Sequence, residues 1–149
     1  MGLLDRFKPF LTRAQKRRVS AAIARAEKTT TGEIHVHLKT MAPPSGLLAG
    51  AEKLFHSLGL HKKKQRNGVL IVIAPSDRKF AIWGDSGIHQ AAGQPFWDKA
   101  RRVLEEGLKA GKPCEALEAC VAEVGACLAE HFPPSPEDKN ELADDVTED

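Results

Sequence analysis

The sequence predicts an α/β fold, a three-layer α/β/α sandwich with a small central mixed β-sheet. Segments with the apolar spacing of helices alternate with short segments that have strand patterns. One strand segment is aliphatic without interruption, which is typical of a strand covered on both faces. The chain has 149 residues, 42% of them hydrophobic, which is enough to bury a core without disulfides or a structural metal. We therefore expect one domain.

The first half of the chain predicts two helices and one strand. Residues 1–11 form an amphipathic lead-in, and Thr12 and Gln15 have the spacing of a capping box for a helix over about 13–28. Residues 33–40 alternate apolar and polar side chains, which predicts a strand. A second helix is expected because apolar residues recur at helical spacing, namely Leu47, Ala51, Leu54, Phe55 and Leu58.

The second half predicts a hairpin, a long loop and two helices. The aliphatic strand covers residues 69–74, and a turn at 75–78 joins it to an alternating strand at 79–83. Residues 84–95 contain three glycines and no periodicity, which predicts a loop long enough to carry function. Apolar stripes then predict a helix from Phe96 that is closed by Gly111, and another from Pro113 to about Phe132.

The net charge of +2 conceals two oppositely charged parts of the chain. Residues 133–149 contain seven acidic residues and one lysine, so this segment carries −6 and the rest of the chain carries +8. A proline-rich, acidic segment without aromatic residues cannot bury enough apolar surface to offset its ordering entropy. The expected organisation is an amphipathic lead-in at 1–11, a folded domain at 12–133 and a disordered acidic tail at 134–149.

Composition also predicts where in the cell the protein resides and which classes of partner it binds. No apolar run approaches the roughly 20 residues of a transmembrane helix and no signal peptide is visible, so a cytoplasmic protein is expected. The lead-in predicts docking on the body or a weak peripheral membrane contact. The basic segment 62–66 lacks interleaved aromatic residues, so no specific nucleic-acid partner is expected. Cys114, Cys120 and Cys127 fit no metal or disulfide pattern and are expected to pack as small apolar residues.

Common catalytic motifs are absent from the sequence. There is no phosphate-binding P-loop, no GxGxxG, no HExxH and no GxSxG nucleophile elbow. Residues 84–87 read Gly-Asp-Ser-Gly, but Ile88 and His89 follow where the trypsin-type motif continues with Gly-Pro. His35 and His37 lie two apart on one strand face and could chelate zinc, although no third ligand is evident and a polar or helix-covered face is the favoured interpretation.

Four carboxylates are candidate metal ligands because of their positions. Glu33 begins the first strand, Asp77 lies in the turn after the aliphatic strand, Asp85 opens the long loop and Asp98 begins the third helix. A loop folded back across the sheet would bring Asp85 to Asp77 or Asp98 in an oxygen-rich site for calcium or magnesium. The hairpin strands run antiparallel, however, so Asp77 and Asp85 need not share one end of the sheet. In the alternative interpretation Asp77 forms an Asx-type turn and Asp98 interacts with the helix dipole.

Several short motifs, in this order and spacing, resemble those of the TPM domain family. They are Ala26-Glu27, Thr31-Gly32-Glu33-Ile34, residues 67–74, Asp77-Arg78-Lys79, residues 82–88, Phe96-Trp97-Asp98, Gly125 and Phe132-Pro133. The family occurs in a plant thylakoid acid-phosphatase-like protein and in many bacterial proteins. The resemblance implies an α/β/α sandwich whose surface crevice binds a divalent metal, calcium in some members, with weak acid-phosphatase activity in some.

Two functional hypotheses follow. In the first, a crevice lined by the four carboxylates binds a divalent cation, and in a weak phosphatase version Arg78 holds the phosphate and His89 donates a proton. His89 stands where many family members have Glu. In the second, the domain is a non-catalytic module that recognises a protein partner or an anionic surface. The sequence leaves both open, and with them the question of whether the protein is an enzyme.

Overall fold

A computed structural model describes residues 9–136 and 145–149 of the chain. The elements follow in the order α1 (Arg13–Glu27), β1 (Glu33–Leu38), α2 (Leu47–Ser57), η2 (Leu60–Lys62), β2 (Gly68–Ala74), η3 (Pro75–Asp77), β3 (Lys79–Gly84), α3 (Ser86–Ala92), α4 (Gln94–Lys109), α5 (Pro113–His131) and β4 (Val146–Glu148). Most of the predicted lead-in, residues 1–8, lies outside the described residues. Within the described ranges no helix is long and apolar enough to cross a membrane.

The four strands form one mixed sheet in the order β3-β2-β1-β4. β1 pairs in parallel with β2 and with β4, whereas β2 pairs antiparallel with β3, which confirms the predicted hairpin. β2 is buried along its whole length, as its aliphatic sequence predicts. Because β1 and β2 are parallel, their last residues meet at one end of the sheet. We call this the carboxyl end and the opposite one the amino end.

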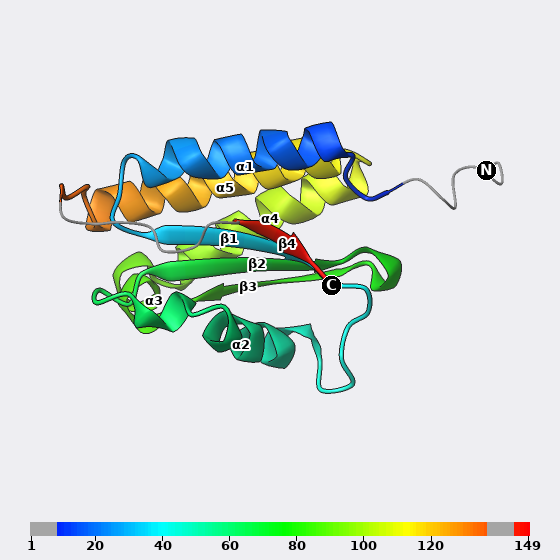
Figure 1. The fold of residues 1–149 in the computed structure, drawn as a ribbon, viewed down its shortest axis with the longest axis horizontal. Helices are drawn as coiled ribbons and strands as arrows, with labels where there is room; N and C mark the ends of the chain where they lie inside the picture. The colour runs from blue at the N-terminus through cyan, green and yellow to red at the C-terminus, as the bar shows by residue number, and fades with distance from the viewer. Residues whose placement is uncertain (1–8, 137–144) are drawn as a thin grey trace, which may run out of the picture.

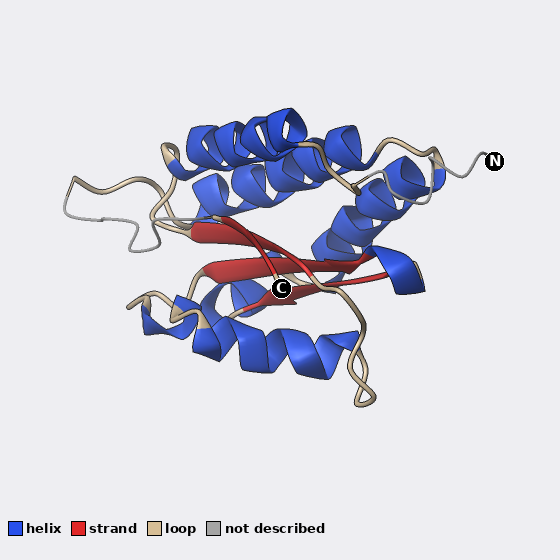
Figure 2. Ribbon diagram, turned by 45° about the vertical axis from the view of Figure 1, so that its right-hand side comes forward, coloured by secondary structure: helices blue, strands red, loops and turns tan. Residues whose placement is uncertain are grey.

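Helices cover both faces of the sheet, so the predicted three-layer sandwich is confirmed (Figures 1 and 2). On one face Ile34, Val36 and Leu38 of β1 pack with the alternate residues of β2 against α1, α4 and α5. On the other face α2 packs on β2 and β3, where Phe55 meets Leu70 and its neighbours in a second, smaller core. The alternation of side chains along each strand therefore divides the apolar residues between two cores.

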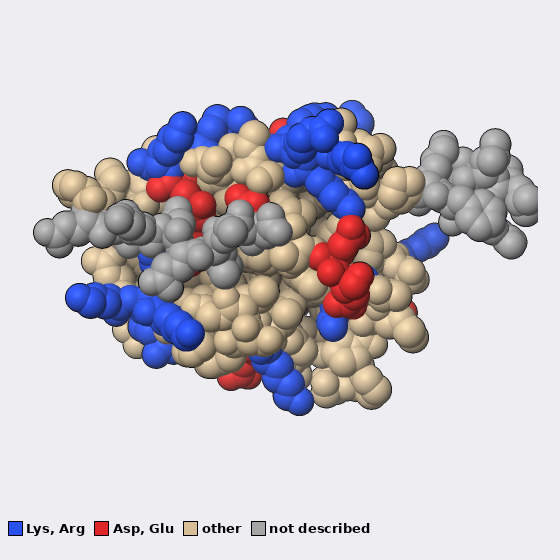
Figure 3. Space-filling model, viewed as in Figure 1, with Lys and Arg blue, Asp and Glu red and all other residues tan. Residues whose placement is uncertain are grey.

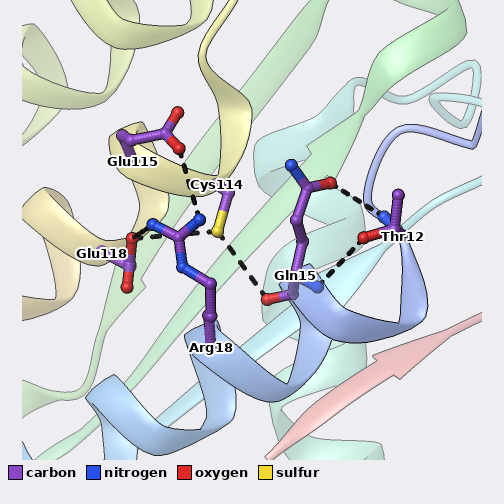
Figure 4. Close-up of polar contacts among 6 residues, drawn as sticks. All are labelled: Thr12, Gln15, Arg18, Cys114, Glu115 and Glu118. Atoms are coloured by element: carbon purple, nitrogen blue, oxygen red, sulfur yellow. Dashed lines mark hydrogen bonds and ion pairs between the residues drawn. The ribbon is translucent and has the colours of Figure 1, made fainter.

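The predicted capping box is present at the start of α1. The Thr12 hydroxyl accepts from the Gln15 backbone N–H at 3.1 Å, and the Gln15 side chain accepts from the Thr12 N–H at 2.9 Å. Beside it, Arg18 of α1 donates to Glu118 of α5 at 2.6 Å, and the Cys114 sulfur lies 3.8 Å from the Gln15 carbonyl oxygen (Figure 4). All three cysteines are buried and unpaired, as expected for small apolar residues, and burial raises their pKa values, that of Cys120 to about 12.

The loop predicted at 84–95 is wrong, because its middle forms α3. The helix begins where the Asp85 carboxylate accepts the Ser86 N–H at 2.7 Å and packs through the buried Ile88. A Cβ at Gly87 would lie 2.0 Å from the Gln65 carbonyl oxygen, and one at Gly84 would lie 2.5 Å from the Trp97 ring. These two glycines therefore permit close packing rather than loop conformations.

Disorder over 134–149 is also a wrong prediction for the last five residues. Residues 146–148 form β4, which pairs with 36–38 of β1, and the Val36 N–H donates to the Asp145 carbonyl at 2.8 Å. Residues 137–144 of the predicted tail lie outside the described part. β4 makes its contacts with a strand more than 100 residues away, so the local composition of the segment could not reveal them.

Candidate functional site

A groove opens at the carboxyl end of the sheet. Its volume is about 760 Å³, and its walls combine the apolar residues Phe10, Phe80 and Leu108 with the cations Arg78 and Lys79. A smaller hollow of about 300 Å³ adjoins it and shares Phe10 and Pro75. In open α/β sheets ligands favour the crevice beyond the carboxyl ends of the strands, which is where both hollows lie. We call the larger one the basic groove.

The turn between β2 and β3 presents Arg78 to the basic groove. Pro75–Asp77 form one 3₁₀ turn, and Arg78 follows in the left-handed region with φ of 53°. The Asp77 carboxylate accepts the Ala42 N–H at 2.7 Å, which ties the turn to the segment after β1. Among the described residues Arg78 and Lys79 make no ion pair, so both exposed cations are available to an anion.

The structure does not bring the four predicted metal ligands together. Asp77 lies at the carboxyl end, whereas Glu33 and Asp85 both flank Gly68 at the amino end. Asp98 is on the surface of α4, where hydrogen bonds from Gln94 at 3.0 Å and Arg101 lower its pKa. In the described residues no group of three or more His, Cys, Asp or Glu is placed to hold a metal ion. The donor set as predicted therefore does not fit one calcium or magnesium ion.

Asp85 is committed to a structural role at the amino end. It is 5% exposed, and its two carboxylate oxygens accept from Arg66 Nε at 2.7 Å and Arg66 Nη2 at 3.0 Å. The same carboxylate caps α3 through the Ser86 N–H. A bidentate guanidinium pair together with a helix cap satisfies this buried charge.

The two predicted catalytic residues also lie apart. Arg78 precedes β3 and His89 lies in α3, beyond the other end of that strand. Six strand residues at about 3.3 Å each separate them by roughly 20 Å. The His89 ring stacks on Trp97 with centroids 6.4 Å apart, so its contact is to the core of the α3–α4 corner. Arg78 and His89 cannot act on the same phosphate in this conformation.

A carboxylate cluster that the sequence did not single out lies at the amino end. Burial of Glu27 raises its pKa to about 7, and the nearby charges of Glu33 and Asp145 act in the same direction. The Ile34 N–H donates to the Glu27 carboxylate at 2.9 Å and opposes this shift, as does the charge of Lys63. The sequence singled out Glu33 as a candidate metal ligand, but Glu27 entered only through the Ala26-Glu27 motif of the family resemblance, and nothing in the sequence connected these two acids with Asp145.

A second unpredicted cluster connects β1 to β4. His35 Nε2 and His37 Nδ1 lie 2.7 Å and 2.6 Å from the Thr147 hydroxyl, and His37 Nε2 lies 2.9 Å from the Asp149 carboxylate. Both histidines are buried. They contact the Thr147 hydroxyl and, at His37, the Asp149 carboxylate, and in the described part of the chain no group of three or more His, Cys, Asp or Glu is placed around them to hold a metal ion.

The order of these elements matches a known family over most of the chain. The family model of the TPM domain matches residues 5–127. The chain belongs to the TPM domain family. The match confirms the resemblance seen in the short motifs, and it includes both ends of the sheet, with Arg78 at one and Asp85 at the other.

Solved structures of other proteins share this TPM fold. The BA42 protein from the psychrophilic bacterium Bizionia argentinensis, determined by NMR, is 34% identical with a TM-score of 0.87, covering 95% of this chain and 97% of its own. The N-terminal domain of the cg2496 protein from Corynebacterium glutamicum is 16% identical with a TM-score of 0.61, covering 89% of this chain and 82% of that domain. An N-terminal domain from P. gingivalis is 20% identical with a TM-score of 0.65, covering 85% and 83%. The latter two show the fold alone. No curated protein matches the chain.

For chemistry, the described part of this TPM domain offers a concave surface with two cations that form no ion pair. The basic groove can bind an anionic group through Arg78 and Lys79 while Phe10 and Phe80 contact an apolar body. The amino end holds carboxylates, but Asp85 is neutralised by Arg66. Binding at the carboxyl end is therefore the activity that this geometry favours.

Proposed function

We propose that this TPM domain is a non-catalytic interaction module whose basic groove binds an acidic segment of a protein partner. The observation that carries the proposal is the pair of exposed cations, Arg78 and Lys79, beside an apolar wall in a groove of about 760 Å³. A nearby carboxylate, Glu105, is already paired with Lys109 at 2.8 Å and does not neutralise them.

The shape of the groove favours a protein segment over a lipid surface. A concave site accepts protruding side chains, whereas a bilayer presents a broad, flat array of charges. Phe10 and Phe80 would contact apolar side chains of the partner, and the cations would contact its carboxylates. A cytoplasmic location, which would expose the domain to such partners, stays a prediction.

The test is a titration of the ¹⁵N-labelled full chain with a synthetic peptide of alternating Glu and Phe. We expect chemical-shift changes confined to residues around Arg78 and Phe80, and at least a tenfold loss of affinity in the variant R78E/K79E. The matched control is K62E/K64E, which changes the charge equally on the loop at the amino end and should bind as the unaltered chain does. Equal affinity in all three proteins, or binding only to anionic lipid vesicles, would overturn the proposal.

Binding of a divalent cation, calcium or magnesium, is a second proposal. It is supported by the family resemblance and by the charges of Glu33 and Asp145 near Glu27, each of which raises the pKa of Glu27, although in the described residues these three acids are not placed as a ligand group for a metal ion. Because the four predicted ligands do not converge, we derive no phosphatase step through a metal. Calorimetric titration with Ca²⁺, Mg²⁺ and Mn²⁺ tests it. Heat that is lost in E33Q and retained in D77N supports a cation at the amino end, and the reverse pattern or no heat contradicts it.

A separate assay tests whether the chain has phosphatase activity. If the module is non-catalytic, the purified chain should hydrolyse p-nitrophenyl phosphate no faster than R78A does, with or without added metal. Hydrolysis that R78A abolishes would overturn the non-catalytic part of the proposal and return the phosphatase hypothesis to first place.

A further inference from the structure

The C-terminal segment, residues 145–149, lies on the outer edge of β1 in the manner of a bound peptide. Its parallel pairing is framed by two backbone hydrogen bonds, from the Val36 N–H to the Asp145 carbonyl at 2.8 Å and from the Asp149 N–H to the Leu38 carbonyl at 3.1 Å. Strand addition of this kind supplies affinity through the main chain and leaves specificity to the side chains. Thr147 and Asp149 contact the histidines of β1, Glu148 pairs with Lys16, and the Ser20 hydroxyl donates to the Asp145 carboxylate at 2.7 Å.

The contacts of the two buried histidines with Thr147 and Asp149 are compatible with one direction of hydrogen bonding when both rings are neutral. A carboxylate only accepts, so His37 Nε2 donates to Asp149 at 2.9 Å. In the neutral ring Nδ1 then accepts from the Thr147 hydroxyl at 2.6 Å, and the hydroxyl in turn accepts from His35 Nε2 at 2.7 Å. One threonine hydroxyl therefore joins both histidines, which makes a hydroxyl-bearing side chain a specific requirement at this position.

Charge complementarity surrounds this chain of hydrogen bonds. The Asp149 carboxylate accepts the Thr40 N–H at 2.9 Å and lies 3.5 Å from the Lys39 ammonium, and the first of these contacts is the main cause of its lowered pKa. Glu148 pairs with Lys16 of α1. An acidic patch over the end of β4 lies directly below basic side chains of α1 in Figure 3. The surface that receives the segment is thus basic, and the segment is acidic.

The segment is also the least buried strand of the sheet. Its residues are half-buried or exposed, whereas β1 and β2 are buried throughout, and only Val146 of β4 packs against the main core. Short elements with few buried apolar contacts open at a lower free energy than the core does. Displacement of β4 would leave the packing of α1 on α5 and the pairing of β1 with β2 intact.

We propose that the outer edge of β1 is a recognition site for an acidic, extended peptide with a hydroxyl side chain, and that residues 145–149 occupy it in cis. The partner pairs in parallel with 36–38, places its hydroxyl between His35 and His37, and places its carboxylates at Lys39 and Lys16. Because the chain's own segment is tethered, it competes at a high effective concentration, so a partner binds once this segment is displaced. This site is distinct from the basic groove and goes beyond the function proposed for it.

The experiment uses a fluorescein-labelled peptide of sequence Asp-Val-Thr-Glu-Asp and the full chain. The variant T147A/D149N weakens the cis contacts without altering β1. We expect the labelled peptide to bind this variant at least tenfold more tightly than the unaltered chain, and the charge-reversed peptide Lys-Val-Thr-Lys-Lys to bind neither. Adding K39E to the variant should abolish binding, whereas K53E, which makes the same charge change on α2, should not.

Hydrogen exchange of the Val36 amide shows whether the segment has been released. Faster exchange in T147A/D149N, together with tighter peptide binding, supports the proposal. It is overturned if exchange is unchanged, if exchange is faster but the peptide does not bind, or if the peptide binds the variant and the unaltered chain equally. Failure of the basic-groove test is distinguishable from failure here, because K39E changes the edge of β1 and leaves Arg78 and Lys79 in place.

Discussion

The two ends of the sheet each carry an arginine in the left-handed backbone region, and the two arginines have opposite environments. Arg66, with φ of 52°, lies at the amino end and forms a bidentate pair with the buried Asp85. Arg78, with φ of 53°, lies at the carboxyl end and has no ion-pair partner among the described residues. The same unfavourable conformation thus supports packing at one end and presents a free cation at the other.

The surroundings of the two arginines extend this contrast. At the amino end the Arg66 carbonyl accepts from the Gly87 and Ile88 N–H groups at 2.9 Å and 3.2 Å, and the Asn67 side chain donates to Thr31 at 3.0 Å. At the carboxyl end the strands finish in a groove of about 760 Å³. One end is closed by hydrogen bonds and close packing, and the other is left open. The proposed binding surface lies at the open end.

Adding a methyl group at the closed end should have the largest effect on stability. In G87A the new Cβ would lie 2.0 Å from the Gln65 carbonyl oxygen and 2.8 Å from that of Arg66, both backbone atoms that cannot move independently. We expect a loss of about 3 kcal/mol or more in the free energy of unfolding, measured by urea denaturation. A91S on the exposed side of the same helix is the control and should change it by less than about 0.5 kcal/mol. A similar small loss in G87A would show that α3 can shift away from the loop.

Removal of the buried Asp85 carboxylate should have the second-largest effect on the free energy of unfolding. D85A leaves the Arg66 guanidinium without its partner and the start of α3 without its cap, so we expect a loss of about 2 kcal/mol in the free energy of unfolding. D77A at the open end removes one exposed hydrogen bond to the Ala42 N–H and should cost about 1 kcal/mol or less. Equal losses in the two variants would mean that the amino end is not the more tightly constrained one.

The closed end should also determine how stability depends on pH. The folded pKa of Glu27, about 7, lies above its ordinary value of 4.5, so the folded chain binds a proton more tightly than the unfolded chain does. The associated stability is fully present below about pH 4.5 and is lost as pH rises through 7. E27Q keeps an acceptor for the Ile34 N–H but has no charge to bury. We expect it to exceed the unaltered chain by about 2 kcal/mol at pH 8 and to lose this advantage at pH 5, in urea titrations at both values. A constant difference at the two pH values would contradict the assignment.

Periodicity was sufficient to predict the layers of the fold but not α3 and β4. β2 and α5 are predictable from the sequence because their buried apolar residues recur at strand or helix spacing. α3 contains one buried apolar residue, Ile88, and its glycine serves a contact with Gln65 that the sequence cannot show. β4 is a short acidic strand whose contacts are all made with distant residues, so composition suggested disorder instead.

The candidate site was predicted in part for a similar reason. The sequence placed Asp77 and Asp85 after strands, and the antiparallel hairpin indicated that they need not share an end, as the structure shows. It could not show that Arg66 neutralises Asp85, because an arginine in a charged loop has no periodic signal. Arg78 was expected to hold a phosphate beside His89, but the length of β3 separates them. Which charges are already paired is a property of the tertiary structure, and that property distinguishes the two ends.

Replacement of each arginine by glycine should have effects of opposite sign, and the effect of R78G should be the smallest of the series. Glycine adopts positive φ without a Cβ clash, so R78G at the open end should raise the free energy of unfolding by about 0.5 kcal/mol. R66G at the closed end gains the same relief, but it leaves the buried Asp85 carboxylate without its cationic partner. This loss outweighs the gain, so the urea midpoint should fall. R78G should lose affinity for the acidic Glu-Phe peptide even as it gains stability, whereas R66G should bind through whatever fraction remains folded. A midpoint that falls in R78G would mean that the Arg78 side chain stabilises the turn, and its strained conformation would then need no ligand to explain it.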